Sequence, residues 1–182
     1  NLGLSLTLLE LSDTHDVSII EMGASLPGEI EALCKIAMPT HGLITNIAPA
    51  HLEGFGSIRN IVFEKAALFR SIKTGICFVN NTDKHIVDMP ITSEKITFGL
   101  TPNCDFSADI YHENDGTLTL VLNTDVIPTK SHNLSFLKNS IAVITIAKVL
   151  DVELTTIINQ IQSFKTPPGR CQVKQIDDVT VI

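Results

Sequence analysis

The sequence lacks the features that mark several large classes of protein. Its 13 lysines and arginines are outnumbered by 20 aspartates and glutamates, and this net charge of -7 leaves no basic patch for nucleic acid. No uninterrupted apolar stretch approaches the ~18 residues that indicate a membrane helix. The four cysteines form no CxxC pair and follow no export signal, which predicts reduced thiols in a cytoplasmic protein.

Two common catalytic motifs are also missing. None of the ten glycines is followed by a lysine, so the GxxxxGK[ST] phosphate-binding loop is absent from this sequence. No GxSxG motif is present to support a serine nucleophile. An anionic ligand would therefore need a metal ion or a local group of hydrogen-bond donors.

The sequence does contain enough apolar material for a core. Apolar residues make up 44% of the 182 residues and charged residues 18%, which fits one folded domain and excludes a disordered chain. The chain starts at Asn1 and stops inside the apolar alternation of Val179-Thr180-Val181-Ile182. We expect residues 1–182 to be one domain taken from a longer protein.

Strand-like and helix-like segments alternate along the first hundred residues, which predicts an α/β fold with a mostly parallel sheet flanked by helices. A turn at Asn114-Asp115-Gly116 predicts a hairpin and so a small antiparallel patch. The predicted strands are 17–22, 42–47, 76–80 and 95–100 with two short ones closing the chain, and the predicted helices are 27–37, 57–72, 139–150 and 154–164.

Two side chains follow neighbouring predicted strands, at the edge where such sheets bind ligands. Glu21 lies at the end of the first strand, and His51 lies in the glycine-bearing loop after the second. A carboxylate and an imidazole there could hold a divalent metal ion such as Mg²⁺. Taken singly, a glutamate in this position is more often a helix cap, and a loop histidine is more often simply exposed.

Lys65 stands out because it projects from the apolar side of the predicted helix 57–72. It lies seven residues after Ile58 and four before Phe69, so its amine is in the middle of an apolar stripe. Burial would lower the pKa of the amine and allow a modification such as carbamylation by carbon dioxide. Alternatively, the stem lies along the stripe and the amine reaches water.

Several motifs together resemble the Mur ligase family. The match is strongest over Thr45 to Ser57, which reads TNIAPAHLEGFGS, and it continues in the K-x-x-L-F of Lys65 to Phe69. Further matching segments are Asn1-Leu2-Gly3 with Leu6 to Leu9, Glu21 to Ser25, Gly28-Glu29-Ile30, Asn81-Thr82-Asp83 and Pro168-Gly169-Arg170.

This resemblance implies the central ATP-binding domain of the family, with a fold like that of P-loop NTPases. Its phosphate loop would lie upstream of Asn1 and a C-terminal domain would follow Ile182, so the fragment alone would be inactive. Within the family, the sequence is most similar to the members that join D-alanyl-D-alanine to UDP-N-acetylmuramoyl-tripeptide in peptidoglycan synthesis. The implied substrates are ATP, that tripeptide and that dipeptide, and the implied cofactor is Mg²⁺.

The resemblance also implies roles for single residues. Glu21 and His51 would hold Mg²⁺, and Lys65 would be carbamylated so that its new carboxylate helps to position the metal. Asn81 and Asp83 would lie near the adenine. Arg170 would contact the nucleotide phosphates.

The sequence departs from the family pattern at several positions. Ser25 replaces the usual asparagine, and Ala66 and Ala67 replace the common Gly-Glu after the lysine. The family segment G-x-H-N-x-x-N is also altered. When its second asparagine is aligned with Asn139, a nucleotide-binding candidate, Ser135 and Phe136 stand at its His and first Asn positions. A shifted alignment would place His132-Asn133 at those two positions.

Two other functions remain open from the sequence. One is a divergent Mur-like domain that binds a nucleotide or a partner without catalysis. The other is a metal-dependent hydrolase with a carbamylated lysine, which would need more histidine and aspartate ligands than the chain offers.

Overall fold

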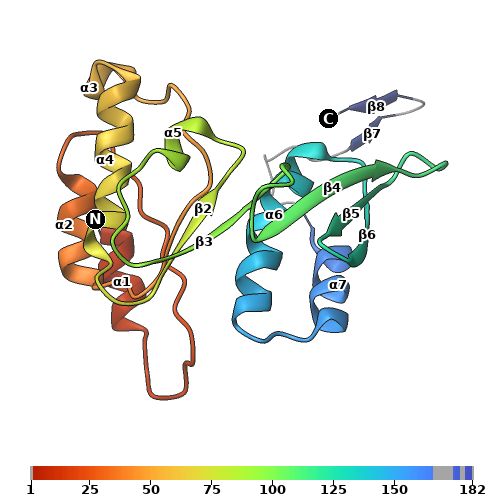
Figure 1. The fold of residues 1–182 in the computed structure, drawn as a ribbon, viewed down its shortest axis with the longest axis horizontal. Helices are drawn as coiled ribbons and strands as arrows, with labels where there is room; N and C mark the ends of the chain where they lie inside the picture. Colours follow the sequence, from red (N-terminus) through yellow and green to blue (C-terminus); the bar gives the residue numbers. More distant parts are fainter. Residues whose placement is uncertain (1, 166–173, 177–178, 182) are drawn as a thin grey trace.

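Four parallel strands and an antiparallel pair form one six-stranded sheet (Figure 1). The computed structural model describes residues 2–165, 174–176 and 179–181. The sheet order is β1-β2-β3-β4-β5-β6, parallel from β1 to β4 and antiparallel from β4 to β6. Its strands are β1 (Gly42–Ile44), β2 (Ile76–Asn80), β3 (Glu94–Gly99), β4 (Phe106–His112), β5 (Leu118–Leu122) and β6 (Asp125–Ser131).

Helices cover this sheet, and a separate antiparallel pair follows it in the chain. That pair consists of β7 (Lys174–Ile176) and β8 (Val179–Val181). The helices are α1 (Leu2–Leu9), α2 (Glu29–Ala37), α3 (Leu52–Phe55), α4 (Ile58–Ser71), α5 (Lys84–Val87), α6 (Leu134–Val149) and α7 (Leu154–Ser163). Within the described ranges, every helix is too short or too polar to cross a lipid bilayer.

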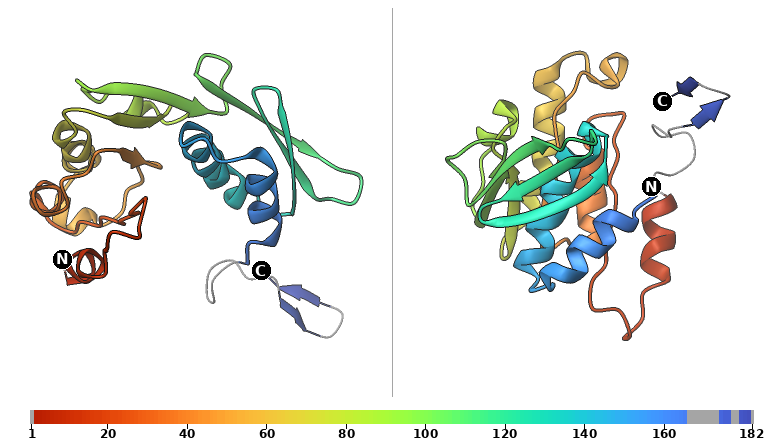
Figure 2. Two further views of the ribbon diagram at one scale, coloured as in Figure 1. Left: turned by 90° about the horizontal axis from the view of Figure 1, so that it is seen from below. Right: turned by 90° about the vertical axis from the view of Figure 1, so that its right-hand side faces the viewer.

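The two-residue period of β2 divides the core between two layers of helices. Phe78 joins a cluster that includes buried residues of α6 and α7. Its neighbours Cys77 and Val79 join a different cluster, which contains Phe69 of α4. Figure 2 shows α6 and α7 lying together against the green and teal strands β4 to β6.

Helix α4 lies between the sheet and α2. Ala66 and Phe69 face the sheet cluster, whereas Ala67 packs with Ile30 and Leu33 of α2. A helix buried on two sides needs apolar residues around most of its circumference. The two adjacent alanines of α4 therefore have a packing role, one towards each neighbouring layer.

The predicted fold class is confirmed, and several predicted elements are accurate. Strand β2 has the predicted bounds, and Ser57 caps α4 by accepting a hydrogen bond from Asn60 N at 3.2 Å. Helix α6 begins at Leu134, five residues before the predicted start, because the Asn133 side chain accepts from Phe136 N at 3.0 Å and caps it there.

The prediction of a strand at 17–22 was wrong. The segment forms neither a helix nor a strand, and Val17 and Ile19 are exposed. An apolar run becomes a strand only where a neighbouring backbone is available for pairing, and no described strand pairs with this one. The predicted Pro27 start of α2 was also wrong, since the helix begins at Glu29 after Gly28 with φ 88°.

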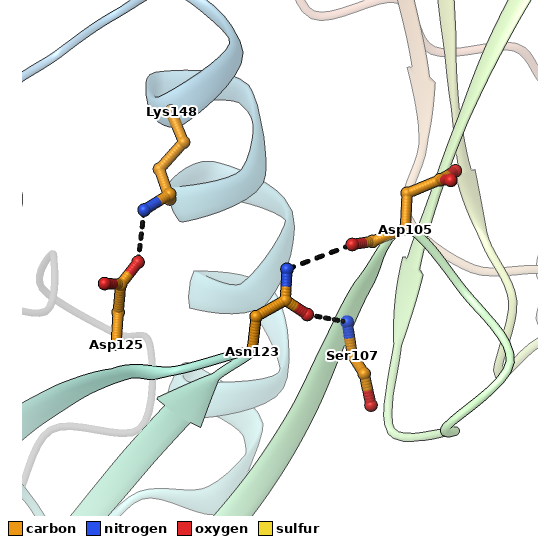
Figure 3. Close-up of polar contacts among 5 residues, drawn as sticks. All are labelled: Asp105, Ser107, Asn123, Asp125 and Lys148. Carbon is orange, nitrogen blue, oxygen red and sulfur yellow. Dashed lines mark hydrogen bonds and ion pairs between the residues drawn. The ribbon is translucent and has the colours of Figure 1, made fainter.

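Asn123 joins the turn between β5 and β6 to the start of β4 (Figure 3). Its side chain accepts from Ser107 N at 2.9 Å and donates to Asp105 O at 3.0 Å. Asp125, the first residue of β6, forms an ion pair with Lys148 of α6. These contacts attach the antiparallel patch to the parallel sheet and to α6.

Candidate functional site at the carboxyl ends of the strands

Three chain segments meet where β1, β2 and β3 end. The Asn80 side chain donates to Thr45 O at 2.8 Å, which connects the ends of β2 and β1. Leu100 N donates to the Thr82 hydroxyl at 2.9 Å, which connects the ends of β3 and β2. Because parallel strands end at one edge of the sheet, residues distant in sequence gather there.

A single peptide group after β1 is bound at both ends by charged side chains. Lys65 Nζ donates to Asn46 O at 3.1 Å, and Ile47 N donates to Asp83 Oδ2 at 2.7 Å. The C=O of Asn46 and the N–H of Ile47 belong to the same peptide bond and point in opposite directions in its trans form. The position of this loop, which leads to His51, is thereby fixed by α4 and by the residue that caps α5.

Lys65 is half-buried, and burial lowers the pKa of its amine. The negative charge of Asp83 acts in the opposite direction and raises that pKa. Desolvation is the larger of the two effects, so the neutral amine is more accessible than in an exposed lysine. The amine reaches the polar loop after β1 through its bond to Asn46 O, whereas the modification of Lys65 stays a prediction.

A shallow hollow of about 440 Å³ opens beside this peptide group. Asp83 lines the hollow and caps α5, accepting from His85 N at 2.9 Å through its second oxygen. Each carboxylate oxygen thus has one backbone partner and one further acceptor position. The hollow is lined by Asn46, Asn80, Thr82, Asp83, Lys84 and His85.

Glu21 and His51 lie on two segments that touch. Both side chains are exposed, and His51 has φ 55° at the start of α3. A methyl group added at Gly54 would overlap the carbonyl oxygen of Ser25, so the loop of Glu21 packs directly on α3. No group of three or more His, Cys, Asp and Glu side chains placed to hold a metal ion is found among the described residues.

The remaining predicted site residues are not brought together with Lys65 in the same way. The Asn81 side chain donates to Asn103 O at 2.9 Å and so holds the segment after β3. Asn139 is exposed on α6 and does not line the hollow. Arg170 lies outside the described residues. The roles of these residues in nucleotide binding stay predictions.

Sequence reasoning missed Glu64, the residue before Lys65. Glu64 is 4% exposed and accepts from Gly28 N and Ile30 N, each at 2.7 Å. The signal was available, because Glu64 lies three residues after Ile61 and four before Leu68 on the apolar stripe. A carboxylate in that position needs partners, which no local pattern identifies.

The described cysteines are free thiols, as predicted. Cys34 and Cys77 are buried, and burial raises the pKa of both and of the partly buried Cys104. A raised pKa keeps a thiol protonated and unreactive at neutral pH.

Comparison with known families and proteins gives a consistent result. The model of the Mur ligase middle domain matches residues 1–147. A UDP-N-acetylmuramoyl-tripeptide--D-alanyl-D-alanine ligase from Haemophilus influenzae is 33% identical over 180 residues, which cover 93% of this chain and 38% of that protein. The ligase of the same name from Escherichia coli is 30% identical over 186 residues.

Solved structures agree in fold. A crystal structure of MurF from Acinetobacter baumannii superposes with a TM-score of 0.87 at 25% identity and covers 98% of this chain and 41% of that chain. A MurF ligase from Thermotoga maritima in complex with ADP gives a TM-score of 0.80 at 26% identity. The chain thus spans about two fifths of the length of the proteins it resembles.

Proposed function

This chain belongs to the Mur ligase family through its middle domain, and we propose that it is the nucleotide-binding core of an enzyme that joins D-alanyl-D-alanine to UDP-N-acetylmuramoyl-tripeptide. The observation that carries the proposal is the relatedness to ligases of that name along 93% of the chain. The half-buried Lys65 at the carboxyl ends of β1 and β2 supports it independently. We place the reaction in the cytoplasm, where ATP is available.

The proposed reaction has two steps. The terminal carboxylate of the tripeptide attacks the γ-phosphorus of ATP, so an acyl phosphate forms and ADP leaves. The free amine of D-alanyl-D-alanine then attacks the acyl carbon, giving the amide, inorganic phosphate and a proton. Catalysis of such a transfer depends mainly on positioning and on neutralising the charge of the phosphates.

We assign Lys65 to carry a carbamate. Its neutral amine attacks carbon dioxide, a nitrogen–carbon bond forms, and one proton is released, which leaves a carboxylate on the side chain. The lowered pKa favours this step, because only the neutral amine is a nucleophile. The hydrogen bond to Asn46 O holds the amine at the strand ends.

The chemical types of the side chains at this site suit a magnesium ion. Magnesium keeps several waters and takes one or two carboxylates together with phosphate oxygens, so it does not need a cluster of protein ligands. Glu21 and His51 are exposed on segments that pack together at Gly54, and we assign both to hold the ion with the carbamate of Lys65. When bound, the metal would offset the charge of the nucleotide phosphates.

For the nucleotide we assign Asn81, Asp83, Asn139 and Arg170. Asp83 lines the hollow beside β1 and retains free acceptor positions. Asn81 shapes the adjacent segment through Asn103.

Phosphate release tests the function. The full-length protein that contains this chain is assayed with Mg-ATP, the tripeptide substrate and D-alanyl-D-alanine, with each component omitted in turn. We expect release only when both the tripeptide and the dipeptide are present, and Lys65→Ala to abolish it while Lys35→Ala, at an exposed position of α2, does not. A folded protein without release would contradict the proposal and favour a non-catalytic domain that binds nucleotide or a partner.

A further inference from the structure

Glu64 is a charged side chain buried beneath the candidate site, and its surroundings are unusual. Among the side chains that the structure describes, the other buried polar ones are Thr119, Thr129, Ser140 and Thr145, none of them charged. No lysine, arginine or histidine forms an ion pair with Glu64 in the described part of the chain. Burying an unpaired carboxylate is costly, so its hydrogen bonds must be strong and well placed.

Both carboxylate oxygens of Glu64 bind the N-terminal end of α2. Oε2 accepts from Gly28 N and Oε1 from Ile30 N, each at 2.7 Å. Gly28 is the residue before the helix, has φ 88° and offers no side-chain cap. Glu64 therefore supplies, from a helix more than thirty residues away in sequence, the cap that α2 lacks locally.

The constraint continues from α2 towards Glu21 and His51. Glu29 Oε2 accepts from Ser25 N at 2.7 Å and from Leu26 N at 2.9 Å, which fixes the segment before the helix. The Ser25 carbonyl in turn packs on Gly54 of α3. A continuous set of contacts thus runs from Glu64 through the start of α2 to the loops of Glu21 and His51.

Helix α4 carries Lys65 directly after Glu64, and successive helical residues point about 100° apart. Glu64 therefore holds α2 while Lys65 holds the peptide group after β1. We propose that Glu64 is a positioning residue that fixes the loops of Glu21 and His51 relative to Lys65. This inference rests on the proposed function, because it takes those three residues as the groups to be aligned.

The test uses the full-length protein with Glu64→Gln, which keeps size and shape but replaces one acceptor oxygen by an NH₂ donor facing a backbone N–H. Glu64→Asp, one methylene shorter, is the second variant. Glu31→Gln is the matched control, since Glu31 is an exposed glutamate of α2 whose ion pair is with Lys35 of the same helix. Two measurements are made: amide hydrogen exchange of residues 25–30, and the Mg²⁺ dependence of phosphate release.

We expect exchange of residues 25–30 to be about tenfold faster in both Glu64 variants, with exchange in β2 unchanged. The Mg²⁺ concentration for half-maximal release should rise about tenfold, with kcat at saturating Mg²⁺ retained. A general loss of stability would instead accelerate exchange in β2 and lower kcat without moving the Mg²⁺ midpoint, which would overturn the proposal.

Unchanged exchange at residues 25–30, or faster exchange with an unchanged Mg²⁺ midpoint, would also overturn it. The measurements distinguish a failure of the proposed ligase function from a failure of the positioning role of Glu64. If the wild-type protein releases no phosphate, the proposed function is contradicted, and the exchange of residues 25–30 then decides alone whether Glu64 fixes this segment.

Discussion

Lys65 and Asp83 bind the opposite ends of one peptide group, the Asn46–Ile47 bond, with Lys65 Nζ 3.1 Å from its oxygen and Asp83 Oδ2 2.7 Å from its nitrogen. The two side chains come from α4 and from the start of α5, so three elements are joined through one bond. The same pair is coupled electrostatically, because Asp83 raises the pKa of Lys65 while burial lowers it.

Asp83→Asn should lower the pKa of Lys65 further. The substitution removes the opposing negative charge and leaves desolvation uncompensated, so the ammonium loses its proton at a lower pH. Trace acylation of the protein over a range of pH, read by peptide mass spectrometry, measures the free-amine fraction. Labelling of Lys65 should begin at lower pH in the variant, with the exposed Lys35 as internal reference; a shift to higher pH would contradict the assignment of Asp83.

Gly54→Ala should loosen the contact between α3 and the loop of Glu21. The added methyl group would overlap the Ser25 carbonyl oxygen, and overpacking of this kind costs about 1–3 kcal/mol. Urea unfolding gives the loss of stability, and hydrogen exchange at Leu26 reports the local opening. Gly23→Ala is the control, because no atom of the described part of the chain lies within 4 Å of its added methyl group. Equal effects from both alanines would show that the close approach at Gly54 does not matter.

Thr145→Val should stabilise the protein. Thr145 is fully buried in α6, and its hydroxyl oxygen has no hydrogen-bond partner among the residues that the structure describes. Replacing that hydroxyl by a methyl group of similar size should raise the free energy of unfolding by about 1 kcal/mol. Thr129→Val is the matched comparison, since that buried hydroxyl donates to Leu118 O and accepts from Ser131 N, and its loss should cost about 1–2 kcal/mol. Urea denaturation measures both, and opposite signs are the expected result.

Two substitutions at Asn123 should separate the contribution of its backbone conformation to stability from that of its side-chain hydrogen bonds. Its φ of 53° lies in the left-handed region, and its amide bonds to Ser107 and Asp105 (Figure 3). Asn123→Gly loses the amide but tolerates the backbone, whereas Asn123→Ala loses the amide and strains the backbone. We expect the alanine variant to be less stable than the glycine variant by about 1 kcal/mol. Thermal unfolding of the two variants checks this, and equal melting temperatures would argue against backbone strain.

Local sequence determined the elements whose signals lie within a few residues. Ser57 precedes an apolar stripe with helical spacing, and a cap followed by that period is sufficient to start α4. Four of the five residues of β2, Ile76 to Val79, form a short apolar run, so this strand could be predicted from the local sequence. The unusual position of Lys65 followed from counting along one helix.

The tertiary structure alone decided which distant groups meet. Glu64 finds its partners 36 and 34 positions away at Gly28 and Ile30, and Asp83 binds Ile47 from 36 positions away. Residues 17–22 carry a strand-like pattern, yet no strand in the described chain pairs with them. Periodicity reports which side of an element is apolar, whereas hydrogen-bond partners depend on how elements pack, and that geometry is a property of the whole fold.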